Sequence, residues 1–314
     1  DALAEFARVA PDVRLVNLET SITTSDEYWP GKGIHYRLHP DNARCLAEAG
    51  IDACTLANNH VLDYGYAGLA ETLTALRRTG IECAGAGTSA AAAAVPAVID
   101  TGRGRLIVYS YGLRSSGIPP DWSAGADRGG VNYLDALSSE ALEIVAGHIK
   151  AVKRDGDVAV VSLHWGSNWG DDIPREHQDF AHRLVDEAGA DLVHGHSSHH
   201  PRAIEVYNGK LILYGTGDFI NDYEGIGGHD KYRGDLVMMY FASVEVASGR
   251  LVDLTMVPMQ IRRLQPRYAS RADASYLAAL LSRVGKRFGS GARLGDDNRL
   301  HLEWQRDAAR ERGQ

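Results

Sequence analysis

Residues 158–166 read Val158-Ala159-Val160-Val161-Ser162-Leu163-His164-Trp165-Gly166. The almost wholly apolar first part of this stretch is typical of a buried strand. Residues 175–188 follow as a helix with an inward apolar face, and this helix leads directly into a second strand that begins at Asp191. A strand, a helix and a strand in this order predict an α/β domain with a largely parallel sheet.

The same alternation extends in both directions from this unit. Upstream, strands and helices continue to alternate, and from Arg202 onward the pattern changes to paired strands joined by Asn-Gly and Ser-Gly turns. The predicted strands are 13–18, 51–57, 81–84, 95–99, 105–111, 203–206, 211–214, 236–246 and 251–261, and the predicted helices lie around 41–49, 69–79, 142–152 and 276–284. We therefore expect antiparallel strands on the same body as the α/β part.

Composition limits the classes of partner. With 314 residues, 44% of them hydrophobic, the chain can bury a sizeable core without disulfide or metal cross-links. The formal net charge of −8 repels nucleic acid and anionic lipid, so we expect no nucleic-acid partner. Three scattered cysteines have no metal-binding spacing, and their odd number argues against a complete disulfide framework.

The chain shows no targeting signal that would place it in a membrane. No apolar run approaches the length of a spanning helix, and the first residues do not form a signal peptide. We therefore expect a soluble, cytoplasmic protein with no membrane anchor in this chain. Because the sequence opens inside an amphipathic helix without an initiator Met, an upstream segment is also consistent with it, and a removed anchor there would imply an extracytoplasmic location.

Four of the 13 histidines crowd into the seven positions from 194 to 200, as His194, His196, His199 and His200. Neutral imidazole is the commonest protein ligand of zinc, iron and nickel. If the strand continues, His194 and His196 share one face, and the Ser-Ser turn brings His199 or His200 back towards the same point. The alternative is a polar loop in which the histidines cap backbone groups.

Ligand-type side chains also follow three other predicted strands. Glu19 follows the first strand, Asn59 and His60 follow the second, and His164 ends the apolar strand. In an α/β sheet, ligands collect outside the carboxyl ends of the strands. Each residue taken alone could have a purely structural role, such as that of Asn in a tight turn. Together, however, a carboxylate, a carboxamide and imidazoles supply the mixed oxygen and nitrogen ligands of a divalent metal.

These residues resemble a known family, the CapA or poly-γ-glutamate synthesis (PGA_cap) proteins, which are relatives of the calcineurin-like metallophosphoesterases. The similarity extends over roughly residues 12 to 260. The motifs that carry it are Asn17-Leu18-Glu19-Thr20, Ala57-Asn58-Asn59-His60-Val61-Leu62-Asp63-Tyr64-Gly65, His164-Trp165-Gly166, Gly195-His196-Ser197-Ser198-His199-His200 and Leu213-Tyr214-Gly215-Thr216-Gly217-Asp218-Phe219. The Asn-His block with its Asp-Tyr-Gly continuation is the most specific of them.

The resemblance implies an α/β fold, a metallophosphatase-like sandwich of two mixed β-sheets flanked by helices (α/β/β/α). It implies one domain over residues 1–265, on which residues 266–314 pack as a C-terminal helical extension. It also implies a site for one or two divalent ions, Mn, Fe or Zn, near the strand ends. The ligands that it implies are Glu19, Asn59, His164, His196 and His199, with His194 as a competitor because two serines separate His196 from His199.

Further roles follow from the same resemblance. His60 is expected to contact the substrate and assist the leaving group. Asp218 stands where family members commonly have Asn, and its carboxylate is expected to add a ligand or orient a histidine. Family members usually begin with a Gly-Asp strand whose Asp binds metal, and no such segment precedes Asp1. Without that aspartate, a single weaker metal site is the alternative to a two-metal site.

A substrate wall is predicted around these residues. Its members are Arg37, Asp63, Tyr64, Trp165, Lys231 and Arg233. Residues 222–233 join glycines to aromatic and charged groups, as a lid does, although an ordinary long connection fits them as well. The expected ligand is a small molecule or a poly-γ-glutamyl chain, and the oligomeric state stays open.

Two functions compete at this point. The first is a metal-dependent hydrolase that cleaves a phosphoester or an amide such as a γ-glutamyl bond. The second is a non-hydrolytic component of poly-γ-glutamate synthesis or export that binds polymer or partner proteins. The set of ligand-type residues favours the first, and the naming of the resembled family favours the second.

Overall fold

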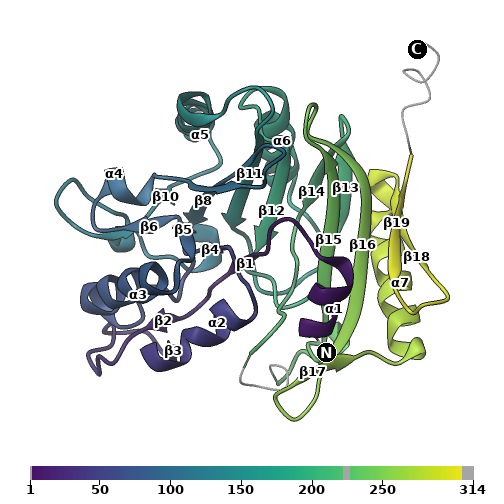
Figure 1. Cartoon of the computed structure of the whole chain (residues 1–314), viewed down its shortest axis with the longest axis horizontal. Helices are drawn as coiled ribbons and strands as arrows, with labels where there is room; N and C mark the ends of the chain where they lie inside the picture. The colour runs from purple at the N-terminus through teal and green to yellow at the C-terminus, as the bar shows by residue number, and fades with distance from the viewer. Residues whose placement is uncertain (1, 222–226, 306–314) are drawn as a thin grey trace.

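The computed structural model describes residues 2–221 and 227–305 (Figure 1). Its centre is a sheet in the strand order β10-β8-β11-β12-β14-β13, called the central sheet below, with β7 paired to β8. The neighbouring strands β10, β8, β11, β12 and β14 are parallel to one another. Strand β13 is antiparallel to β14, and β7 is antiparallel to β8. Their bounds are β7 Ala97–Asp100, β8 Arg105–Leu113, β10 Tyr133–Leu134, β11 Val158–His164, β12 Leu192–His196, β13 Ile204–Tyr207 and β14 Lys210–Leu213.

A smaller parallel sheet, called the second sheet, stacks on one face of the central sheet. It contains β1 (Leu15–Asn17), β4 (Ala53–Thr55) and β5 (Glu82–Ala84) in the order β1-β4-β5. Small alanines of the second sheet pack against valines of β8 and β11, which allows the two sheets to approach closely. The first part of the chain therefore builds two stacked sheets.

Helices cover the outer faces of this pair of sheets. The apolar sides of α5 (Ser139–Val152) and α6 (Arg175–Asp186) share one core with the central sheet, and α2 (Arg44–Glu48) and α3 (Gly65–Thr79) share another with the second sheet. Helix α3 ends because Gly80 takes the left-handed conformation, at φ 73°. The order helix, sheet, sheet, helix is the expected α/β/β/α sandwich, and Figure 1 shows it on the left and centre.

A third sheet completes the molecule on the right of Figure 1, in the order β15-β16-β19-β18 with β17 on β16. Its strands are β15 Leu236–Glu245, β16 Arg250–Ile261, β17 Pro266–Tyr268, β18 Ser290–Leu294 and β19 Leu300–Trp304. The expected C-terminal helix is α7 (Arg271–Gly285). The expected C-terminal helical extension did not include β17, β18 and β19, which pair within this sheet.

The remaining elements are short. They are α1 Ala2–Val9, α4 Ala90–Ala93, the strand pairs β2 Ser21–Ile22 with β3 Arg37–Leu38 and β6 Ala86–Gly87 with β9 Gly130–Val131, and the 3-10 turns Pro40–Asn42, Arg114–Ser116, Pro120–Trp122, Asp230–Tyr232 and Lys286–Phe288. Helix α1 lies on the third sheet, where the rings of Phe6 and Phe241 are 6.4 Å apart. None of the helices in the described residues is long and apolar enough to cross a bilayer.

Candidate metal centre

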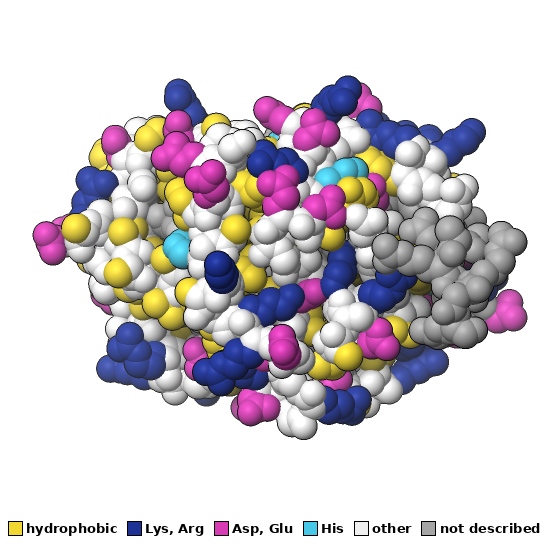
Figure 2. Space-filling model, turned by 90° about the horizontal axis from the view of Figure 1, so that it is seen from above, with side chains coloured by type: hydrophobic (Ala, Val, Ile, Leu, Met, Phe, Trp, Pro, Cys, Tyr) yellow, Lys and Arg dark blue, Asp and Glu magenta, His cyan; other side chains and the backbone are white. Residues whose placement is uncertain are grey.

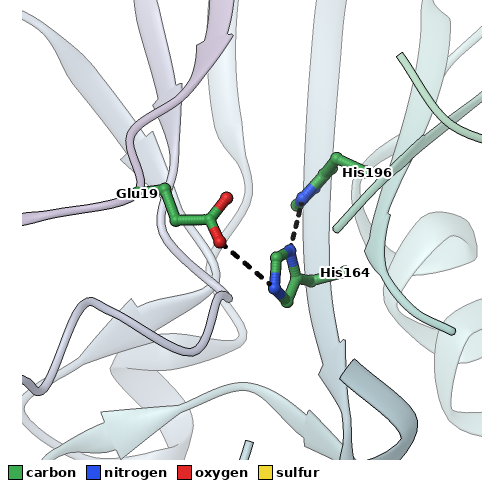
Figure 3. Close-up of side chains that lie close together, drawn as sticks. All are labelled: Glu19, His164 and His196. Atoms are coloured by element: carbon green, nitrogen blue, oxygen red, sulfur yellow. Dashed lines mark hydrogen bonds and ion pairs between the residues drawn. The ribbon is translucent and has the colours of Figure 1, made fainter. Parts of the chain in front are cut away.

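Four strand ends from both stacked sheets deliver polar side chains to one place. Glu19 comes two residues after β1, Asn59 lies in the loop after β4, and His164 and His196 are the last residues of β11 and β12. His164 and His196 are register partners in the parallel pair β11–β12. In Figure 3, Glu19 points across from one side towards the two imidazoles on the other. The structure therefore brings these four residues together, and their role as metal ligands stays a prediction.

The distances define a compact cluster. The Nε2 atom of His164 lies 3.1 Å from Asn59 Oδ1 and 3.5 Å from Glu19 Oε1. Its Nδ1 atom lies 2.7 Å from His196 Nδ1. One ligand atom each from Glu19, His164 and His196 can be chosen so that all three lie within 4.8 Å of one another. Oxygen and nitrogen donors at such separations suit a divalent ion such as Mn, Fe or Zn.

Asn58 holds the two loops of the second sheet together beneath this cluster. Its side chain is fully buried, and its Nδ2 atom donates to Asn17 Oδ1 at 3.0 Å and to the Leu18 carbonyl at 2.9 Å. Its Oδ1 accepts from the His60 backbone N–H at 3.1 Å. Asn17 in turn donates to Glu19 Oε2 at 2.7 Å. The first Asn of the Asn-Asn-His block therefore positions the loop, and the second presents its oxygen to His164.

The electrostatic setting favours a cation. Burial raises the pKa of Glu19 to about 7, and the negative charge of Asp218 adds to the effect. Burial lowers the pKa of His164 to about 3, and it also holds the pKa of His196 well below its ordinary value. The imidazoles are therefore neutral at pH 7, which is the state that can donate a lone pair to a metal. A divalent ion would compensate the half-buried carboxylate beside them.

His60 is fixed by a buried charge pair. Its Nδ1 lies 2.7 Å from Asp63 Oδ2, and Asp63 also accepts from the Tyr36 backbone N–H at 2.7 Å and from Lys32. Lys32 also donates to the Asn59 carbonyl at 2.5 Å. The close contact with a carboxylate oxygen indicates that Nδ1 carries a proton, so Nε2 is the ring atom left for a substrate. Burial lowers the pKa of His60, against the opposite effect of Asp63.

His199 lies in a neighbouring group of charges and is outside the three-residue cluster. Its Nδ1 contacts both carboxylate oxygens of Asp218 at 3.0 Å. Burial alone would lower the pKa of His199, but the hydrogen bond and charge of Asp218, with the charge of Glu19, raise it. Ser197, in the turn that carries the chain from His196 to His199, has φ 108°, a rare conformation for a residue other than glycine.

His194 shares the face of His196 on β12 but contacts Ser162 instead of Glu19 or Asn59. Its Nδ1 lies 3.0 Å from Ser162 Oγ. Gly195, between the two histidines, is required by packing, because a Cβ atom there would lie 2.7 Å from Trp165 Nε1 and 2.6 Å from the Leu213 carbonyl oxygen. Of the histidines proposed as ligands, His164 and His196 are therefore in the cluster, whereas His194 and His199 lie beside it.

Two residues of the predicted substrate wall are in the interior, so their expected role is wrong. Trp165 is 1% exposed, packs in the core of the central sheet and donates from Nε1 to the Tyr214 carbonyl at 3.1 Å. Asp63 is fully buried and orients His60 and Lys32 instead of meeting solvent. A substrate cannot contact either side chain without unpacking it.

The other predicted wall residues lie in several surroundings. The guanidinium of Arg37 contacts Asp26 at 2.7 Å and lies over the Tyr64 ring at 5.1 Å. Arg233 is bound to Asp235 and Asp273 in a network that fixes its guanidinium, at 2.8 to 2.9 Å. Lys231 lines a separate cavity of about 230 Å³ with Asp171, Tyr232, Tyr276, Leu280 and Arg283. The predicted lid falls in part on residues 222–226, which lie outside the described residues.

Sequence reasoning did not select three residues that the structure places around the site. Asn17 and Ser162 each carried an available signal, because Asn17 ends a strand and Ser162 is the polar residue two positions before His164 on the same face of an apolar strand. Lys32 lies in a Pro-Gly-Lys-Gly loop, and nothing in that pattern predicts that its ammonium reaches His60.

Comparison with known proteins identifies the family of this chain. The family model for the bacterial capsule synthesis protein PGA_cap matches residues 1–223, which contain every member of the cluster. The chain belongs to the PGA_cap family. Its expected family membership and sandwich fold are thus confirmed.

Relatives of this PGA_cap protein have names linked to polyglutamate synthesis. It is 45% identical over 304 residues to a probable polyglutamine synthesis accessory protein of Mycobacterium tuberculosis, covering 96% of this chain and 80% of the relative. It is 30% identical over 214 residues to the PGA biosynthesis protein CapA of Bacillus subtilis, covering 68% of this chain and 54% of that protein. It is 24% identical over 241 residues to the capsule biosynthesis protein CapA of Bacillus anthracis, covering 77% and 55%.

Proposed function

We propose that this PGA_cap protein is a metal-dependent hydrolase that cleaves an amide such as a γ-glutamyl bond, or a phosphoester. The observation that carries the proposal is the convergence of Glu19, Asn59, His164 and His196 from four strand ends on one point. Side chains from such distant parts of the sequence meet here without forming part of an apolar core. Their donor types are those of a catalytic metal site.

The chain's own residues fit a bound cation. Glu19 and Asn59 supply oxygens, and His164 and His196 supply neutral nitrogens. A metal held there supplies Lewis acidity and a water that loses its proton near neutral pH. The half-buried carboxylate of Glu19 and the surrounding strands would hold the ion in a fixed position.

His60 supports proton transfer next to this position. Because Asp63 accepts a hydrogen bond from Nδ1–H, the ring keeps one orientation, and its Nε2 lone pair would take a proton from the attacking water and pass it to the leaving group. Lys32 contacts the same pair and anchors the 24–36 loop to the Asn59 backbone. In this arrangement His60 acts on the substrate, whereas Asp63 and Lys32 position His60.

The names of the relatives support the choice of substrate class. The Mycobacterium relative is named for polyglutamine synthesis and the Bacillus subtilis relative for PGA biosynthesis. We therefore place a γ-glutamyl amide first and a phosphoester second. On the face of the molecule shown in Figure 2, Lys and Arg are interspersed with Asp and Glu, so an acidic substrate would depend on local contacts there.

A second candidate function is a non-hydrolytic accessory component of polyglutamate synthesis that binds polymer or partner proteins. The observation that favours it is the name of the Mycobacterium relative, which calls that protein an accessory protein. Under this proposal the histidine cluster has a structural role, and polymer binding is independent of metal.

One preparation tests both proposals. The purified protein is analysed for Mn, Fe and Zn and is then assayed against γ-glutamyl amides and phosphoesters. We expect near-stoichiometric metal, and we expect His60→Ala to retain the metal while losing turnover about 100-fold or more. His39→Ala is the matched control, because His39 is an exposed histidine in the same part of the chain.

The outcomes separate the candidates. Turnover that disappears with chelation and with His60→Ala supports the hydrolase. Metal-free protein without turnover, combined with polymer binding that survives chelation and His164→Ala, supports the accessory role and ends the hydrolase proposal.

A further inference from the structure

Ser162 lies between two imidazoles on the inner face of the central sheet. Its hydroxyl oxygen is 3.0 Å from His194 Nδ1 and 2.9 Å from His196 Nε2. The residue is fully buried and is followed two positions later by His164 on the same strand face. The metal centre therefore continues, through one hydroxyl, to a histidine that does not contact Glu19 or Asn59.

Proton counting restricts this arrangement. A hydroxyl has one hydrogen, so Ser162 can donate to only one of the two nitrogens and must accept from the other. The same holds for the contact between His196 Nδ1 and His164 Nδ1 at 2.7 Å, where one nitrogen must carry the proton and the other the lone pair. Along this chain the three rings contact one another, Ser162 and Asn59, all of which are neutral groups, so each ring is counted as a neutral imidazole with a single proton. The chain of hydrogen bonds therefore has only two consistent directions.

In the first direction each donor points towards Asn59. His194 donates from Nδ1 to Ser162, Ser162 donates to His196 Nε2, His196 donates from Nδ1 to His164 Nδ1, and His164 donates from Nε2 to Asn59 Oδ1 at 3.1 Å. In the second direction every donor is reversed. His164 then presents the Nε2 lone pair to Glu19 and Asn59, and His194 carries its proton on Nε2.

We propose that Ser162 and His194 are positioning residues that set the lone pairs of His164 and His196 for a cation, and that His194 is the terminal acceptor of this relay and not a ligand. The inference rests on the proposed function only in requiring that a cation binds at the cluster. It deepens that proposal, because it names residues outside the ligand set that hold the ligands in the binding tautomer.

A bound cation selects the second direction. If it binds His164 Nε2, the proton on that nitrogen leaves to solvent, and the protons on His196, Ser162 and His194 Nδ1 each move one place towards His164. His194 then takes one proton from solvent at Nε2, so the relay holds the same number of protons before and after. If the cation binds His196 Nδ1 instead, His196 must still donate from Nε2 to Ser162, and Ser162 must still donate to His194. Both binding modes therefore give the same state at His194.

Nitrogen-15 NMR of the histidines measures this state directly, because a ring nitrogen shifts strongly between its protonated and unprotonated forms. The experiment uses the full chain, stripped of metal and then titrated with Zn²⁺ alone. We expect His194 to change from the Nδ1-protonated to the Nε2-protonated form as zinc binds. Zinc binding that leaves His194 unchanged, or that gives it the signature of a metal-bound nitrogen, overturns the relay.

Two serine variants supply the second measurement. Ser162→Ala breaks the relay, so we expect zinc affinity to fall about tenfold, as is typical when an outer partner of a metal ligand is removed, and His194 to stop responding to zinc. Ser110→Ala is the matched control, because Ser110 is the register partner of Ser162 on β8, is equally buried, and its hydroxyl has no hydrogen-bond partner among the described residues.

The two proposals fail in different ways. If the unmodified protein binds none of Mn²⁺, Fe²⁺ and Zn²⁺, the hydrolase proposal fails and the relay fails with it. If zinc binds with full affinity in Ser162→Ala and His194 still changes its tautomer, the relay alone is wrong. Because neither readout is an activity, the result does not depend on knowing the substrate.

Discussion

The ammonium group of Lys32 lies between two oxygen acceptors and the His60 ring at the edge of the candidate metal centre. It contacts the Asn59 carbonyl oxygen, the Asp63 carboxylate and His60 Nδ1, and it lies 5.4 Å from the Trp122 ring. Asp63 is fully buried, so its charge depends on these donors for compensation. Removing the lysine would leave that carboxylate with only the neutral donors of Tyr36 and His60.

We expect Lys32→Met to lower the free energy of unfolding by about 2–4 kcal/mol, because it leaves a buried carboxylate without its cation. Urea denaturation with a constant m-value measures the loss. Adding Asp63→Asn to Lys32→Met removes the uncompensated buried charge. The double variant should therefore recover part of the stability. If the stability losses of the two single variants simply add up in the double variant, Lys32 and Asp63 do not interact.

Residue chemistry was predictable from the sequence where type and position pointed to the same role. Glu19, Asn59 and His164 are ligand-type residues at or shortly after the ends of strands, and the ends of parallel strands meet at one edge. Trp165 was placed wrongly because the residue after a strand can turn into the core or towards solvent, and the sequence does not distinguish the two. Lys32 was not predictable, since its position depends on the path of a loop without regular structure.

At the scale of elements, an ion pair ties the starts of β8 and β11 together at the end of the central sheet opposite the metal centre. Arg105 donates from Nε to Asp157 Oδ1 at 3.0 Å, and Asp157 also accepts from the Arg154 backbone N–H at 2.7 Å. The hydrogen bonds from the Arg105 side chain, and the one from the Arg154 backbone, lower the pKa of Asp157. The carboxylate therefore stabilises the folded state when it is ionised.

We expect Asp157→Asn to lower the free energy of unfolding by about 1–3 kcal/mol at pH 7. A folded-state pKa below the unfolded value of about 3.9 means that this stabilisation is complete above that pH and declines as the pH falls below it. The difference between the two proteins should therefore shrink between about pH 4 and pH 2, which urea titrations at several pH values can follow. Asp155→Asn, at an exposed position two residues away, should show no such difference at any pH.

Element prediction succeeded where the sequence signal was local. The apolar run of β11 and the turn-linked pairs β7–β8, β13–β14 and β15–β16 have partners close in sequence or strong periodicity. Strands β18 and β19 were missed because they are short, contain glycine or alternate weakly, and pair partly with β16, some 45 residues away. Such long-range pairing is set by tertiary packing and is not encoded in a local pattern.

At the scale of the whole molecule, α7 is part of the main core. Leu277 is 1% exposed and belongs to the same apolar cluster as the central sheet and helices α5 and α6. We expect Leu277→Ala to cost about 2–4 kcal/mol of unfolding free energy in a single cooperative transition, because it leaves a cavity in that core. Ser275→Ala, exposed on the same helix, should change stability by less than about 0.5 kcal/mol. A separate, early transition for the C-terminal segment would mean that it folds independently.

The candidate metal centre joins the two stacked sheets, so a bound cation would act as a cross-link between them. Glu19 and Asn59 come from the second sheet and His164 and His196 from the central sheet, and the unfolded chain has no such arrangement. A ligand that binds only the folded state stabilises it by about 2.7 kcal/mol at a free concentration 100 times its Kd. We therefore expect Zn²⁺ to raise the urea midpoint of the native chain in a concentration-dependent way, and His164→Ala to remove most of this gain. His39→Ala should keep it. If zinc stabilised His164→Ala as strongly as the native chain, the ion would be binding elsewhere, and the sheets would be held together by packing alone.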